Sequence, residues 1–109
     1  MKDIFLHLFA GEYLIGREEG SRAFALIDRD LFQKYPEEKF FFNVNGVKVL
    51  APSFCDEVFG ELQIKYPGRL FIDCKISEGL KSSFDVIEET RNIKFDYTNH
   101  FGGKSTGNG

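Results

Sequence analysis

The sequence predicts an α/β fold in which helices pack on a small mixed β-sheet to form a single-domain sandwich. Strand-like apolar runs alternate along the chain with segments whose apolar residues recur at helical spacing, and this alternation is typical of layered α/β domains. The chain has 109 residues, enough for one core without a metal or a disulfide. We therefore expect one domain over residues 1–97 with about three helices, followed by a flexible tail over residues 98–109.

The first third of the chain predicts a strand, a short second strand and a helix. Apolar residues at both alternating positions of residues 3–9 indicate a strand with both faces partly covered, and residues 12–15 are expected to form its partner. Helical spacing then runs over residues 18–35, and Pro36 ends that helix. Its polar side, which includes Asp28, is expected to face solvent.

The rest of the chain predicts two further strand and helix pairs. A continuous apolar run over Lys39–Val44 indicates an interior strand covered on both faces. Because the chain has thirteen Phe and no Trp, we expect phenylalanine to fill much of the core. The other expected elements are an extended piece over residues 47–50, a helix over 54–66, a strand over 69–75, a helix over 77–91 and an edge strand over 93–97.

The charge of the chain is weakly acidic. Fourteen basic and 17 acidic residues give a net charge of -3, and the basic residues are scattered. Binding to nucleic acid or to anionic membranes needs clustered Lys and Arg, so we expect neither partner. Asp3 stands where a signal peptide carries positive charge, and the apolar runs are too short to span a bilayer. These features indicate a reduced, cytoplasmic protein in which Cys55 and Cys74 act as small apolar residues.

Ser53 lies in the most informative stretch, Pro52–Glu57, which opens the helix expected over residues 54–66. A serine followed three residues later by Asp56 is similar to a capping box, so Ser53 is expected to cap the helix through its hydroxyl. The free amides of the first turn also form a local anion site, and a phosphate on Ser53 would add about -1.5 to -2 charge there. Ser53 is therefore interpreted either as a simple cap or as a phosphorylation switch.

The neighbouring candidate groups do not form a catalytic set. Asp56 and Glu57 are adjacent on a helix and point about 100° apart, so they do not converge on one ligand. They are expected to stabilise the helix dipole, and one of them to meet Arg17. His7 is expected to be a packed strand residue, whereas Cys55 in a first helical turn could have a lowered thiol pKa. We expect no enzyme activity, no catalytic residue, no metal and no cofactor.

Asn43-Val44-x-x-Val47 followed by Ser53-Phe54-Cys55-Asp56-Glu57 resembles the STAS-like family of unknown function. That family's pattern is approximately Asp-Phe-x-x-Val, a short gap and then Ser-Phe-Ala-Asp-Glu, and the resemblance covers roughly residues 3–91. Related STAS domains include the bacterial anti-sigma factor antagonists, in which a serine at the start of a helix is phosphorylated by a serine kinase of the histidine-kinase-like ATPase type. The resemblance implies a STAS-like fold and matches Ser53 to that serine, with Asn43 in place of the family's Asp.

The sequence thus predicts a non-enzymatic regulatory module of bacterial signalling that binds a protein partner through the surface around Ser53. The expected interaction residues are Arg17, Ser53, Phe54, Asp56 and Glu57, and the resemblance implies a histidine-kinase-like ATPase or serine kinase as partner. The alternative is a sensor or enzyme that binds a small ligand or anion between Arg17 and the Ser53 helix start. That alternative fails if Arg17 is held by Asp56 or Glu57. A third hypothesis is a scaffold that homodimerises through an exposed sheet edge; the sequence leaves the oligomeric state open.

Overall fold

A four-stranded parallel sheet forms one layer of the domain. The computed structural model describes residues 1–99, and the tail expected over residues 98–109 lies outside these from His100 onward. Strands β1 (Lys2–Phe5), β3 (Phe40–Asn43), β5 (Leu70–Asp73) and β6 (Asp96–Thr98) pair in the order β1-β3-β5-β6, and every pair is parallel. The prediction of a mixed sheet is therefore wrong. Successive strands of this sheet are joined by helical crossovers rather than by hairpins, and a crossover returns the chain in the same direction.

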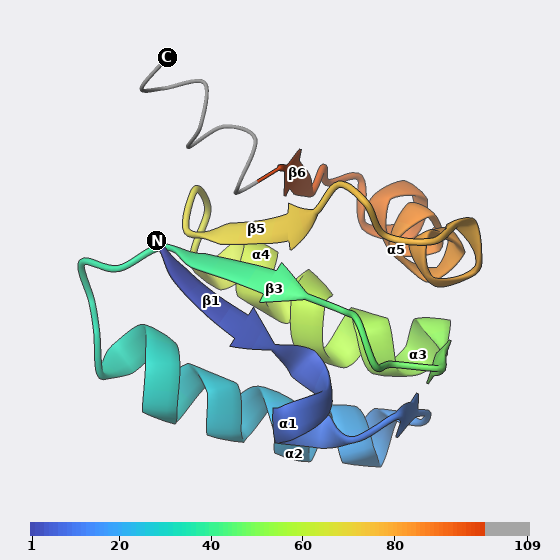
Figure 1. Ribbon diagram of the computed structural model, residues 1–109, viewed down its shortest axis with the longest axis horizontal. Coiled ribbons are helices and arrows are strands. Elements are labelled where there is room, and N and C mark those ends of the chain that lie inside the picture. The colour runs from blue at the N-terminus through green and yellow to red at the C-terminus, as the bar shows by residue number, and fades with distance from the viewer. Residues whose placement is uncertain (100–109) are drawn as a thin grey trace.

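Helices form the second layer, and Figure 1 shows α2 and the helix running from α3 to α4 below the sheet. Helix α2 (Arg17–Ile27) continues into the π-helical segment η1 (Asp28–Gln33). The second helix comprises α3 (Pro52–Cys55), the π-helical segment η2 (Asp56–Gly60) and α4 (Glu61–Lys65). Helix α5 (Glu78–Arg91) begins after Ser77, whose hydroxyl accepts from the Leu80 N–H at 3.4 Å. These three helices were all expected.

The N-terminal segment differs from the sequence-based prediction. The first strand ends at Phe5, and the expected second half of it is a short helix, α1 (Leu6–Ala10), which ends at Gly11 with φ 93°. Strand β2 (Tyr13–Leu14) follows and pairs in parallel with β4 (Val49–Leu50), not with β1. The physical reason is that α1 turns the chain away from the sheet before β2 begins, so a hairpin with β1 cannot form.

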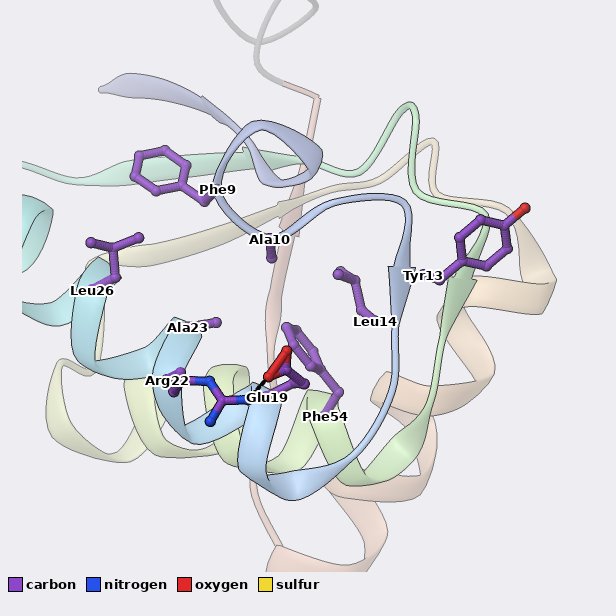
Figure 2. Close-up of a pocket in the computed structure, with 9 residues that line it drawn as sticks. All are labelled: Phe9, Ala10, Tyr13, Leu14, Glu19, Arg22, Ala23, Leu26 and Phe54. Carbon is purple, nitrogen blue, oxygen red and sulfur yellow. Dashed lines mark ion pairs between the residues drawn. The ribbon is translucent and has the colours of Figure 1, made fainter.

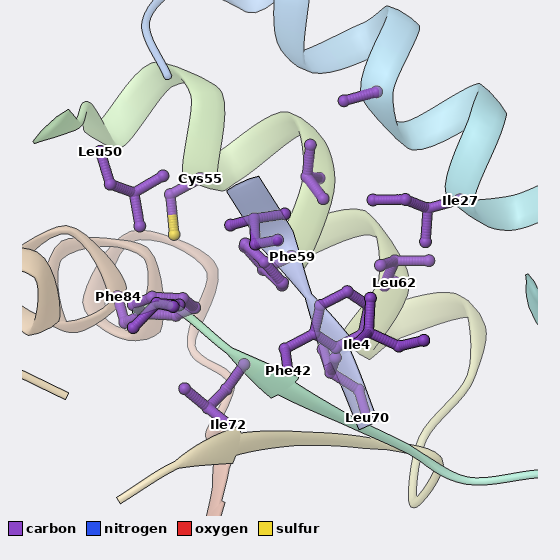
Figure 3. Packing of buried hydrophobic residues seen from close by; sticks show 14 of the residues in the cluster. Ile4, Ile27, Phe42, Leu50, Cys55, Phe59, Leu62, Leu70, Ile72 and Phe84 are labelled. Atoms are coloured by element: carbon purple, nitrogen blue, oxygen red, sulfur yellow. The ribbon is translucent and has the colours of Figure 1, made fainter. Parts of the chain in front are cut away.

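Phenylalanine fills the core, as predicted. The central strand β3 is buried on both faces, with Phe40, Phe41 and Phe42 no more than 3% exposed. On the helical side, Phe59 packs edge-on against Phe42 with ring centroids 5.3 Å apart, and it packs in a tilted arrangement against Phe84 at 5.0 Å. Figure 3 shows these three rings between the sheet, the α3–α4 helix and α5. One continuous core therefore fixes the relative positions of all three main helices.

The described part of the chain also bears on the membrane question. Among residues 1–99, no helix combines the length and the apolar character that crossing a bilayer requires.

Candidate functional site

Ser53 is held at the start of α3, but it does not cap the helix. Ala51 is the N-cap residue, Pro52 takes the first helical position, and no side chain caps this terminus. The capping prediction is wrong because proline, with its fixed φ and missing N–H, suits the first helical position and moves the cap before it. The half-buried Ser53 hydroxyl instead accepts a hydrogen bond of 3.2 Å from the Gly16 N–H. Ser53 therefore ties α3 to the residue that precedes α2.

Arg17, the first residue of α2, bridges to the same helix. Its Nη1 lies 2.7 Å from Asp56 Oδ2 and 3.0 Å from Glu57 Oε2, which confirms the expected contact with the acidic pair. Arg17 is thus already paired with two carboxylates. This arrangement is incompatible with an anion pocket at Arg17, because a ligand anion would have to displace both carboxylates.

Arg91, at the end of α5, completes the cluster and was missed by sequence reasoning. Its Nε lies 2.5 Å from Asp56 Oδ1, and its Nη2 lies 2.8 Å from Glu61 Oε2. The hydrogen bond from Arg91, together with that from Arg17, lowers the pKa of Asp56 against the opposing effect of burial. No sequence signal could have found this contact, since Arg91 is 35 residues away and is a typical cation for a helix C-terminus.

A groove of about 360 Å³ runs between α3 and α5 beside this cluster. Its lining combines the hydroxyl of Ser53, the charges of Arg17, Asp56 and Arg91, the exposed side chains of Pro52, Val86 and Thr90, and the buried Ile87 at its base. Within residues 1–99, the Ser53 hydroxyl accepts one hydrogen bond, from the backbone N–H of Gly16.

Phe54, a predicted interaction residue, and its neighbour Cys55 are not accessible at this site. Phe54 is 1% exposed and belongs to the core, so it is unavailable to a partner. Cys55 is fully buried beside it, and burial raises the pKa of its thiol, so the possibility of a lowered pKa is wrong. Both residues face inward because their side of the α3–α4 helix packs against α2 and α5. His7 packs near Gly46. Its buried Nδ1 has no hydrogen-bond partner within the described residues.

A second polar cluster surrounds Asp28, which was expected to face solvent. Asp28 is 5% exposed and accepts hydrogen bonds from Lys65 Nζ at 2.7 Å, from Gln33 Nε2 at 3.0 Å and from the Tyr66 hydroxyl. Burial by itself raises the pKa of Asp28, but these hydrogen bonds outweigh it and the pKa is lowered. A signal was present in the sequence: Asp28 follows Phe24 by four residues and so lies at the border of the buried stripe. The cluster joins η1 to the end of α4.

A second hollow lies on the opposite side of α3 from the groove. It has a volume of about 210 Å³ and is formed by α1, β2 and α2, with Leu14, Ala23 and Phe54 among its lining residues (Figure 2). Glu19 and Arg22 of α2 form an ion pair at this pocket.

The described residues contain no group of three or more His, Cys, Asp or Glu side chains that could hold a metal ion. In the comparisons with known proteins, no family model, no curated protein and no solved structure matches this chain.

Proposed function

We propose that this chain is a non-enzymatic, STAS-like regulatory module that binds a protein partner through the groove between α3 and α5 and is controlled by phosphorylation of Ser53. The observation that carries the proposal is the position of Ser53 in that groove, beside Arg17, Asp56 and Arg91. A modifiable hydroxyl, two guanidinium groups and an exposed apolar side chain, Val86, share one surface.

The walls of the groove are prearranged for binding. Asp56 is bonded to Arg17 of α2 and to Arg91 of α5, so one carboxylate links all three main helices. A surface that is already rigid loses less entropy when a partner binds. Val86, 42% exposed, supplies the apolar contact that such an interface needs.

Phosphorylation of Ser53 would change the charges of this surface. A phosphate of about -1.5 to -2 charge would attract Arg17 and Arg91 and would repel Asp56, which both arginines now bind. The phosphate and Asp56 would compete for the same two guanidinium groups. The modified groove would therefore present a different charge pattern to the partner, which is the basis of a switch.

The partner class follows from the resemblance. The block Ser53-Phe54-x-Asp56-Glu57 is similar to that of the STAS-like family, and the related antagonists are phosphorylated by serine kinases of the histidine-kinase-like ATPase type. We therefore propose a cytoplasmic ATPase of this kind as partner and kinase. The anion-binding alternative has no comparable support, because Asp56 and Glu57 already occupy Arg17.

The test is affinity capture from the native host with four forms of the protein, followed by mass spectrometry. Wild type and Ser53→Ala are expected to capture the same ATPase, whereas Ser53→Asp and Val86→Glu are expected to lose it. The matched control is Ile64→Glu, which alters an exposed apolar residue of α4 outside the groove and should capture as well as wild type. Equal capture by Ser53→Ala and Ser53→Asp would exclude the switch, and equal capture by Val86→Glu would exclude the groove.

A further inference from the structure

The small sheet formed by β2 and β4 has one covered edge and one open edge. The outer edge of β4 is covered by α5, because the buried Ser83 donates its hydroxyl to the Leu50 carbonyl at 2.5 Å. On the inner side, the Val49 N–H donates to the Glu12 carbonyl at 3.1 Å and the Ala51 N–H to the Leu14 carbonyl at 2.9 Å. Backbone groups of alternate residues point to opposite sides of a strand, so Tyr13 directs its N–H and C=O to the open side. Residues 1–99 provide no partner for these two groups.

Exposed apolar side chains lie around this open edge, next to the exposed ion pair of Lys48 with Glu12. Tyr13 is 62% exposed and its register partner Val49 is 39% exposed. Ile15, two residues after Tyr13, is 55% exposed, and Leu8 of the neighbouring helix α1 is 74% exposed. We call these four residues the edge patch. By contrast, the edge strand β1 of the main sheet carries the exposed charges of Lys2 and Asp3, which protect an edge against pairing. None of the four residues of the edge patch is charged, and the flanking Glu12 and Lys48 pair with each other.

The pocket of about 210 Å³ extends this surface. It lies between β2, α1 and α2, and Figure 2 shows the Tyr13 side chain pointing away from it while Leu14, Ala23 and Phe54 form its apolar wall. The open edge is thus flanked by a hollow with room for a side chain from another molecule.

We propose that the edge patch joins two copies of this chain in a symmetric dimer in which the β2 strands pair antiparallel about a twofold axis. An interface of this kind uses the same surface on both copies, so it must be self-complementary. The edge patch meets that condition: an open strand edge offers donors and acceptors that its own antiparallel copy can satisfy, and its four side chains bring no like charges together.

The available area is sufficient. With roughly 150–230 Å² for each fully exposed residue of these types, the four residues offer about 400 Å² of apolar surface per copy. A dimer that covered all of this surface on both copies would bury about 800 Å² of apolar area, and apolar atoms make up about 60% of a typical interface. The whole interface would reach about 1,300 Å², within the range of specific complexes. An extended segment of a different protein is the rival occupant of the same edge.

The experiment is sedimentation of wild type, Ile15→Glu and Ile64→Glu over a wide range of protein concentration. Ile15 and Ile64 are both 55% exposed, so the two substitutions add the same charge at equal exposure inside and outside the edge patch. Wild type and Ile64→Glu are expected to pass from monomer to dimer with the same dissociation constant, and Ile15→Glu to dimerise at least about tenfold more weakly. Hydrogen exchange of the Tyr13 amide in wild type should slow as the dimer forms.

Three results would overturn the proposal. They are a wild-type monomer at every concentration, a dimer that Ile15→Glu does not weaken, and a dimer in which the Tyr13 amide stays unprotected. Binding of another protein's extended segment at the edge by a wild-type monomer would assign the surface to the rival occupant. Urea unfolding of each variant verifies that it is folded. If Ile15→Glu is not folded, Leu8→Glu takes its place, because Leu8 is the most exposed residue of the edge patch. The outcome is independent of the groove, which shares no residue with the edge patch.

Discussion

Asp28 is the residue whose environment differs most from the sequence-based expectation. A buried carboxylate is costly unless it is fully hydrogen-bonded, and Asp28 receives bonds from three side chains: Lys65, Gln33 and Tyr66. The Lys65 side chain is 48% exposed, so solvent screens that ion pair and the neutral hydrogen bonds carry much of the stabilisation. Asp28 therefore acts as a structural anchor between η1 and α4.

Asp28→Asn is expected to lower the free energy of unfolding by about 1–3 kcal/mol at neutral pH, because the charge-assisted hydrogen bonds are lost. The folded-state pKa of Asp28 lies below its unfolded value of about 3.9, so its contribution is present above that pH and is lost as pH falls through the folded pKa. Urea denaturation should thus show this difference in the free energy of unfolding between wild type and Asp28→Asn at pH 7, and a smaller difference at about pH 3. The control is Asp85→Asn, which breaks an exposed pair with Lys81 and should cost less than about 0.5 kcal/mol. A pH-independent difference would contradict this account of Asp28.

At the scale of elements, the packing of α2 against the α3–α4 helix depends on Gly20. A Cβ at Gly20 would lie 2.8 Å from the Glu57 Cβ and 3.2 Å from the Phe54 carbonyl oxygen. The two helices approach so closely that only glycine fits between them. This contact also sets the distance over which Arg17 reaches Asp56 and Glu57, so helix packing and the charge cluster depend on each other.

Gly20→Ala tests this packing against intrinsic helix propensity. Alanine is the better helix former by about 1 kcal/mol, but the clash with backbone and Cβ atoms is expected to outweigh this and destabilise the protein by about 1–3 kcal/mol. Gly79→Ala in the first turn of α5 is the matched control, since its Cβ would meet nothing within 4 Å, and it should be neutral or stabilising by up to about 1 kcal/mol. Thermal unfolding of both variants measures the difference. Equal effects of the two substitutions would refute the close-packing argument.

At the scale of the whole molecule, the aromatic core makes the domain one cooperative unit. Phe59 contacts Phe42 of the sheet and Phe84 of α5, so it connects the two layers and the last helix (Figure 3). Removal of such a ring leaves a cavity that close-packed neighbours cannot fill. The loss of packing energy then destabilises every element rather than one helix.

Phe59→Ala is expected to destabilise the domain by about 3–5 kcal/mol, a large part of the total stability of about 5–15 kcal/mol of a typical domain. Circular dichroism and tyrosine fluorescence should still report one coincident transition, because the core is continuous. Ile64→Ala, which removes an exposed side chain, should change stability by less than about 1 kcal/mol. Separate transitions for the two probes would show instead that the helices unfold independently of the sheet.

The candidate site was predictable in part. Arg17, Ser53, Asp56 and Glu57 were selected from local patterns, and the contact of Arg17 with the acidic pair is confirmed. The capping role of Ser53 was not predictable from its spacing to Asp56, because Pro52 competes for the first helical turn. Arg91 gave no local signal at all, since its role depends on α5 crossing beside η2.

The sequence by itself determined the α/β class, the three main helices and the central strand, because apolar periodicity is a local property that follows from burial. It also determined that phenylalanine would fill the core. The tertiary structure decided which strands are neighbours, since pairing joins residues far apart in the chain: β2 lies beside β4, and the main sheet is parallel throughout. It likewise decided that Phe54 faces inward, that Asp28 is buried and that one edge of the small sheet stays open. These are properties of packing between elements, and no single segment encodes them.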